Sequence, residues 1–211
     1  MASKAPMKRL LRRYTSLSAL IQLLRDQQLT LLSPSTWDDR NDAHFLRQYA
    51  TQKKLGAVLA ACFATAGETY HHWKVFSHGL DGVCIEFDRD RLLAALKSHD
   101  GLRFGDVRYW KLDRIRRRPP KTDDLPFVKR HPFRDEKEFR IIYDSAENIR
   151  FKAFPIGLNC ISRIILSPWS NKPLADAIKA TIHDIDGCGK LRVYRTTLID
   201  NEGWKNAVTS P

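Results

Sequence analysis

Apolar and polar residues alternate in several short runs, which predicts a chain built largely from strands. Residues 81–88 place Val83, Ile85 and Phe87 on one side and polar or smaller residues on the other. Residues 57–65 form an almost continuous apolar run, which is typical of a buried strand. Further extended segments are predicted at 10–15, 29–34, 102–110, 149–155, 161–167 and 191–199.

Helical spacing separates these strands. Ser16 is a candidate N-cap, and Leu17, Leu20, Ile21 and Leu24 follow at the spacing of one apolar helix face. Further helices are predicted within 42–53 and 67–76, after Asp88 or Asp90, and within 173–183. A mixture of this kind indicates an α+β fold, mostly antiparallel, with a basic arm at 1–9, one domain at 10–200 and a tail at 201–211.

The stretch 134–143 has a polar and an apolar side. On a strand, Glu136, Glu138 and Arg140 would share one face, while the apolar residues 139, 141 and 143 would face the core. The polar face is either a solvated edge of a sheet or a functional site. Either way, Arg140 is placed to form a salt bridge that orients a neighbouring carboxylate.

Composition narrows the class of protein. The chain has 211 residues, of which 43% are hydrophobic and 28% charged, as expected for a globular protein with a buried core. The apolar run at 55–67 is shorter than the ~20 residues needed to cross a bilayer, and residues 1–13 show no signal-peptide pattern. The four cysteines contain no C-x-x-C pair, so we expect a reduced, cytoplasmic protein.

The net charge of +12 is unevenly distributed. Residues 1–13 carry five bases and no acid, and residues 103–121 carry eight bases against two acids. Pro119 and Pro120 prevent a regular element throughout 114–126, which predicts an exposed basic loop. An anionic partner, with nucleic acid as the first candidate, would contact the basic side chains of this loop. A loop that only faces solvent is the ordinary alternative. The candidate nucleic-acid contacts are Arg114, Arg116, Arg117, Arg118 and Lys121.

Several short motifs occur in a recognisable order. They are R-R-Y-T-S, S-P-S-T-W-D-D-R-N-D, A-C-F-A-T, H-H-W-K-V-F, D-G-V-C-I-E-F-D, K-R-H-P-F-R-D-E-K-E-F-R and C-I-S-R-I-I-L-S-P. Their order resembles the bacterial family known as domain of unknown function 2971, over roughly residues 10 to 198. Lys129, Glu136, Glu138 and Arg140 match its last motif. Ala64 stands where that family usually has serine.

The same order is more distantly similar to ADP-ribosyltransferase-like folds. This resemblance implies two small sheets with about four helices, and NAD bound between the sheets as substrate. It implies that Glu138 stabilises the transition state and that Glu136 orients the acceptor or takes its proton. It further implies cofactor contacts from Arg13, Thr65, Trp73 and Arg140. The implied function is an NAD-using transferase acting on or near nucleic acid, as a toxin or phage-defence effector.

Two other interpretations stay open. The chain could be a non-catalytic nucleic-acid-binding module whose acidic face is structural. It could also be a metal-dependent nuclease, because Asp135 and Lys137 form half of a D-x-K signature. The spacing of His71 and His72 does not suit a metal, and although the acidic turn at 37–42 could bind one, we predict no metal site. The acidic turn is better read as a helix cap.

Overall fold

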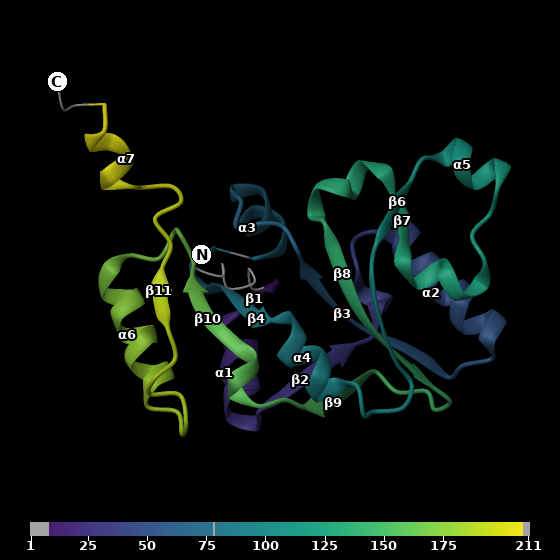
Figure 1. The fold of residues 1–211 in the computed structure, drawn as a ribbon, viewed down its shortest axis with the longest axis horizontal. Coiled ribbons are helices and arrows are strands. Elements are labelled where there is room, and N and C mark those ends of the chain that lie inside the picture. Colours follow the sequence, from purple (N-terminus) through teal and green to yellow (C-terminus); the bar gives the residue numbers. More distant parts are fainter. Residues whose placement is uncertain (1–8, 78, 209–211) are drawn as a thin grey trace, which may run out of the picture.

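A mixed nine-stranded sheet forms the centre of the computed structural model, which describes residues 9–77 and 79–208 (Figure 1). Its strands are β1 (Leu10–Ser16), β2 (Gln28–Leu32), β3 (Ala57–Ala64), β4 (Gly82–Asp88), β5 (Leu102–Asp106), β8 (Glu138–Ser145), β9 (Phe151–Pro155), β10 (Ile161–Leu166) and β11 (Val193–Arg195). A separate parallel pair consists of β6 (Arg108–Trp110) and β7 (Val128–Arg130).

Seven α-helices lie within the described ranges: α1 (Leu17–Asp26), α2 (Arg40–Lys53), α3 (Tyr70–Phe76), α4 (Arg89–Leu96), α5 (Leu112–Arg117), α6 (Lys172–His183) and α7 (Glu202–Asn206). Short 3-10 turns occur at η1 (Pro34–Thr36), η2 (Gly79–Asp81), η3 (Thr122–Phe127), η4 (His131–Glu136) and η5 (Leu158–Cys160). Each described helix is too short or too polar to cross a membrane.

The large sheet consists of three groups of strands that are joined weakly. β11, β10, β4 and β1 form one group, β3, β8 and β5 a second, and β2 and β9 a third. The first and second groups meet at a single register pair, Arg12 opposite Ala64. The second and third meet at Leu32 opposite Ala60. By contrast, β3 and β8 pair along their whole length. The sheet is therefore continuous, but it splits between β1 and β3.

The two faces of the sheet are covered differently. One face carries the main core, against which the apolar sides of α1, α4 and α6 pack. The other face carries two smaller clusters, one under α2 with Leu46 and Tyr49 and one under α3 with Trp73. The strip of sheet between these smaller clusters, next to the split, is left open for a site.

Several predicted details need correction. The mostly antiparallel α+β architecture is confirmed, but the sheet is a single large one rather than two small ones, because the register pairs at Ala64 and Ala60 connect the groups. Residues 9–77 and 79–208 form seven α-helices, where the resemblance implied about four. The basic loop contains α5, which ends at Arg117, before the two prolines. Residues 1–8 of the predicted basic arm lie outside the described residues.

Candidate active site

A row of facing residues crosses five strands on the open side of the sheet. From β10 to β8 it runs through Arg163, Glu86, Arg12, Ala64 and Glu138, each opposite the next in register. Neighbouring strands lie about 4.8 Å apart, so Arg12 and Glu138 emerge roughly 10 Å from one another. Ala64 between them has only a methyl group, which leaves room above the sheet.

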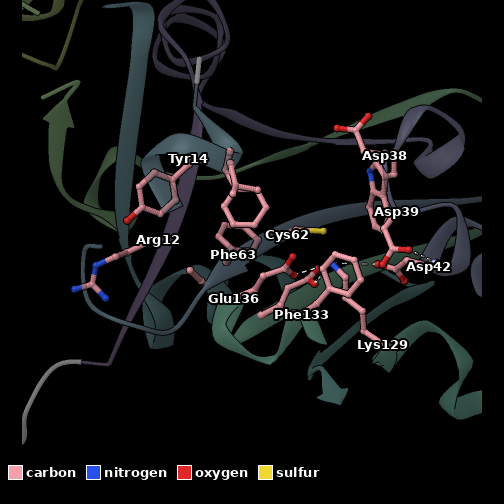
Figure 2. A pocket seen from close by; sticks show the side chains of 15 residues that line it. Arg12, Tyr14, Asp38, Asp39, Asp42, Cys62, Phe63, Lys129, Phe133 and Glu136 are labelled. Atoms are coloured by element: carbon pink, nitrogen blue, oxygen red, sulfur yellow. Dashed lines mark hydrogen bonds and ion pairs between the residues drawn. The ribbon is translucent and has the colours of Figure 1, made fainter. Parts of the chain in front are cut away.

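A pocket of about 400 Å³ occupies this space, and Figure 2 shows its lining side chains. This volume lies within the range of about 300–1,000 Å³ that is usual for small-molecule sites. Arg12 and Tyr14 line it from β1, and Glu136 and Glu138 line it from the other side of the split. Phe76 of α3 and Trp37, before α2, add aromatic walls.

Glu138 is held in a buried network at the start of β8. Arg140 donates from Nε to Glu138 Oε1 at 2.6 Å and from Nη2 to Oε2 at 3.0 Å. The same guanidinium donates from Nη1 to Asp42 Oδ1 at 2.8 Å, and its Nη2 also contacts Asp42. Because Arg140 has no exposed surface, it holds two carboxylates in fixed positions.

Glu136 reaches the same pocket by a different route. It ends the 3-10 turn η4, and Lys137 then adopts a left-handed conformation with φ 44° before β8 begins at Glu138. The prediction that Glu136 lies on the strand is therefore wrong, although its side chain still faces the pocket. Lys129 of β7 donates from Nζ to Glu136 Oε2 at 2.6 Å and to Glu138 Oε2 at 3.3 Å.

The two glutamates differ in protonation. Burial raises the pKa of Glu136 to about 7, because the charge of Lys129 offsets only part of the desolvation. Burial would also raise the pKa of Glu138, but Arg140 and Lys129 outweigh it and lower that pKa to about 2. Glu138 is thus ionised at neutral pH, while Glu136 exchanges a proton there. A pair separated in this way is typical of acid–base sites.

The buried charges near the glutamates do not balance. Asp42, Glu136 and Glu138 are three carboxylates, whereas Lys129 and Arg140 are two cations. With every group ionised the cluster would carry one excess negative charge in a desolvated place. This excess favours a proton on Glu136 or, equally, positive charge in a bound ligand.

The opposite end of the pocket is basic. Glu86, which has no exposed surface, accepts from Arg12 Nε at 2.7 Å and from Arg163 Nη2 at 3.1 Å. Two arginines sharing one carboxylate leave one excess positive charge. Tyr14 also lines the pocket, and its buried hydroxyl has at most the weak Cys84 thiol as a hydrogen-bond partner among the described residues.

No protein-family model and no curated protein match the chain, so the resemblance to domain of unknown function 2971 is not confirmed. Solved structures of similar fold do exist. Three of them are of Thermus sp. 2.9 DarT. The structure of DarT in complex with ADP-ribosylated ssDNA has a TM-score of 0.48 and 12% identity to this chain. The match covers 93% of this chain and 98% of that one. The structure of DarT in complex with NAD+ has a TM-score of 0.46 and 12% identity, and the match covers 92% of this chain and 98% of that one.

A third DarT structure, in complex with carba-NAD+, has a TM-score of 0.44 at 13% identity, covering 90% of this chain and 96% of that one. Each of the three alignments covers nine-tenths or more of both chains. The similarity places no side chain, so the roles below are argued from the residues of this chain.

Four predicted cofactor contacts lie outside the pocket wall. Arg13 points to the opposite face of the sheet, where its guanidinium lies 5.9 Å from the centre of the Phe63 ring. The Thr65 hydroxyl donates to the carbonyl of Lys137 at 2.8 Å. Trp73 is fully buried and donates to Glu68 at 2.7 Å, and Arg140 lies beneath the glutamates. None of the four is among the lining residues.

The predicted nucleic-acid contacts form an exposed group beside the site. Arg114, Arg116, Arg117, Arg118 and Lys121 are all exposed. The Arg114 guanidinium lies 4.0 Å from the Trp110 ring centre, which fixes α5 against β6. In the same strand the Tyr109 hydroxyl accepts from the backbone N–H of Glu138 at 2.8 Å. The basic segment is thus anchored directly to the strand that carries Glu138.

The structure also adds residues that sequence reasoning missed. Arg12, Tyr14 and Phe133 line the pocket, and Lys129 and Asp42 complete the acidic cluster. Asp39 caps α2 by accepting from the backbone of Asn41 and Asp42, which confirms the helix-cap interpretation of the acidic turn. Lys129 had one signal, its place in the last motif. The pairing of Asp42 with Arg140 joins residues 98 positions apart and left no local pattern.

Proposed function

We propose that the chain is an ADP-ribosyltransferase that uses NAD as its donor substrate. One observation carries the proposal: a pocket with an acidic cluster at one end and an arginine at the other, in which two adjacent glutamates differ in protonation. NAD has the complementary charges, with a cationic nicotinamide ring at the reacting end and an anionic diphosphate farther along. The excess negative charge near Glu136 and the excess positive charge at Arg12 fit that order.

The chemistry asked of these residues is limited. When NAD is bound, the bond between its ribose and nicotinamide breaks, the bonding electrons leave with nicotinamide, and an acceptor nucleophile bonds to the same ribose carbon. Glu138, fixed by Arg140, supplies a constant negative charge where positive charge develops. Glu136, with a pKa of about 7, takes the proton that the nucleophile loses. The products are nicotinamide, the modified acceptor and one proton.

Arg12 has the role first assigned to Arg13. Its side chain lines the pocket and its guanidinium is oriented by Glu86, so it can bind a diphosphate oxygen. The rings of Tyr14, Phe76 and Trp37 supply aromatic surface for a planar group. Cys62 also lines the pocket, but burial raises the pKa of its thiol, which argues against a cysteine nucleophile.

The proposed acceptor is nucleic acid. The exposed arginines of α5 lie on a segment anchored to Glu138 through Tyr109, so a polyanion bound there would lie beside the pocket. A nucleic-acid acceptor agrees with a role as a toxin or phage-defence effector. The non-catalytic binding module is the second candidate, because the same exposed arginines would serve it equally well.

Release of nicotinamide separates the two candidates. The folded wild type, incubated with NAD and total cellular nucleic acid, is expected to release nicotinamide. With NAD labelled in its adenosine, the label should be transferred to the nucleic acid. Glu138→Gln and Glu136→Gln should each lower the rate by at least about a hundredfold. Glu147→Gln, an exposed glutamate outside the pocket, is the matched control.

Equal nicotinamide release by the wild type and both pocket variants would reject the assigned roles. Nucleic-acid binding by a folded wild type that neither binds nor cleaves NAD would establish the binding module instead.

A further inference from the structure

A second concavity adjoins the candidate active site on the side of α2. Its volume is about 560 Å³, and it shares Trp37 and Asp38 with the first pocket. Arg40, His44 and Arg47 of α2 form one wall. Nothing in the proposed chemistry of the glutamates uses these three residues.

The three basic residues form one row on the helix. Positions 40, 44 and 47 are four and three residues apart, so their side chains project from the same face of α2. All three are exposed, whereas Leu46 and Tyr49 of the same helix face the core. In the described part of the chain, no ion pair or hydrogen bond engages the side chain of Arg40 or Arg47. This differs from Arg12 and Arg140, which are both held by carboxylates.

The charge of this concavity favours an anion. Two arginines and one acid, Asp38, line it, which leaves one excess positive charge. A guanidinium donates two parallel hydrogen bonds to a phosphate, and two guanidiniums around one hollow can hold the same phosphate from two sides. A row of bases on a flat, solvated helix face would be unremarkable. Here the row lines a hollow that opens beside a reaction centre.

The order of charges along the site indicates which part of the bound substrates would lie in the second concavity. Figure 2 shows Glu136 between Arg12 on one side and Asp42, at the start of α2, on the other. The carboxylates therefore lie between two basic ends. If the proposed function holds, a donor with its diphosphate at Arg12 puts its reacting carbon at the glutamates. The next group beyond the reacting carbon would then lie at α2.

We propose that Arg40, His44 and Arg47 form a binding site for a phosphate group next to the candidate active site. The order of charges favours the phosphate of a phosphodiester acceptor; a donor bound in the reverse direction, with its diphosphate at α2, is the alternative that the experiment separates. The site itself depends only on the residues of α2, so it can be tested without any turnover of NAD.

His44 provides a local readout. With inorganic pyrophosphate as the probe, the imidazole resonances of His44 in the wild type should shift saturably. The double variant Arg40→Ala/Arg47→Ala should bind pyrophosphate at least about tenfold more weakly by this signal. Arg40→Lys/Arg47→Lys, which keeps the charge but loses the planar forks, should fall between the two.

The matched control is Arg25→Ala/Lys179→Ala, which removes the same charge from exposed positions on two other helices and should leave the His44 response unchanged. An equal shift of His44 by chloride at the same ionic strength, or an unchanged response in the α2 double variant, would overturn the proposal.

Two further arms identify the source of the phosphate. Displacement of pyrophosphate from His44 by NAD assigns the site to the donor. Displacement by a short single-stranded oligonucleotide, with NAD already bound, assigns it to the acceptor. If neither displaces pyrophosphate, the proposed site is not part of the NAD reaction, and the transferase proposal is unaffected.

Discussion

At the scale of single residues, the outcome depends on how each glutamate is held. Alternation along 138–143 correctly predicts which side chains of β8 face the core. It cannot predict that Arg140 is fully buried and that Glu138 is almost so, because their partner Asp42 comes from a distant helix. The left-handed residue Lys137 likewise has no sequence signal that distinguishes it from a strand residue.

Glu136 is expected to lower the stability of the folded protein at neutral pH. In the folded state Glu136 keeps its proton up to about pH 7, while in the unfolded chain it loses the proton near pH 4.5. The folded state therefore binds more protons in that window, and stability falls as pH rises through it. At pH 8 the free energy of unfolding of Glu136→Gln should exceed that of the wild type by about 2 kcal/mol, and its melting temperature should be higher. The variant should nevertheless lose transfer activity. Chemical denaturation at pH 5 and pH 8 measures the difference. Equal stability of the two proteins at pH 8 would contradict the assigned protonation.

Glu138 has the opposite effect. Its pKa of about 2 lies below the unfolded value of 4.5, so its contribution is present above pH 4.5 and is lost as pH falls toward 2. Glu138→Gln removes one partner of a buried ion pair and should cost about 3 kcal/mol at neutral pH. Its melting temperature should also vary less than that of the wild type between pH 4.5 and 2. A variant as stable as the wild type at neutral pH would show that the pair with Arg140 is weak.

At the scale of elements, β1 shows where sequence reasoning stops. The chain has two adjacent arginines there; the pattern correctly predicts the strand, and the resemblance assigned Arg13 to the cofactor. Choosing between them requires knowing which face of the sheet is open. That depends on how β1 pairs with β3 and β4, and Arg12 is the one that lies opposite Ala64 and Glu86.

Arg12→Ala should remove most of the protection that NAD gives against heat, because its guanidinium is the cation at the basic end of the pocket. Arg13→Ala is the neighbouring control, since its side chain lies on the other face. It is expected to change the melting temperature without changing the shift that NAD produces. Thermal melts with and without millimolar NAD compare the variants. Equal loss of the NAD shift in both would argue against the assigned faces.

At the scale of the whole molecule, charge is the property that composition predicts best. Two segments, 1–13 and 103–121, hold eleven of the twelve net positive charges, and the second includes the exposed arginines of α5. The division of the sheet into weakly joined groups was not predictable, because single register pairs arise from the packing of the whole chain.

Binding to nucleic acid should be independent of sequence and should weaken steeply with salt. The slope of log affinity against log salt is expected to approach about 0.9 per neutralised phosphate on duplex DNA. Replacing Arg116, Arg117 and Arg118 together by alanine should flatten that slope. Filter binding measures this slope. The salt range of roughly 50 to 200 mM is chosen because phosphate contacts weaken strongly over it. An unchanged slope would show that α5 is not the contact surface.

Trp37 makes the two adjoining pockets visible to spectroscopy. Its indole lines both of them, and its ring centre lies 5.1 Å from the Arg140 guanidinium. Of the five tryptophans, Trp73 is sealed in the core and Trp204 is 79% exposed, so both should respond little to a ligand. Intrinsic fluorescence is therefore a label-free signal that a ligand has entered, and its loss in Trp37→Phe would assign the emission change to this one ring.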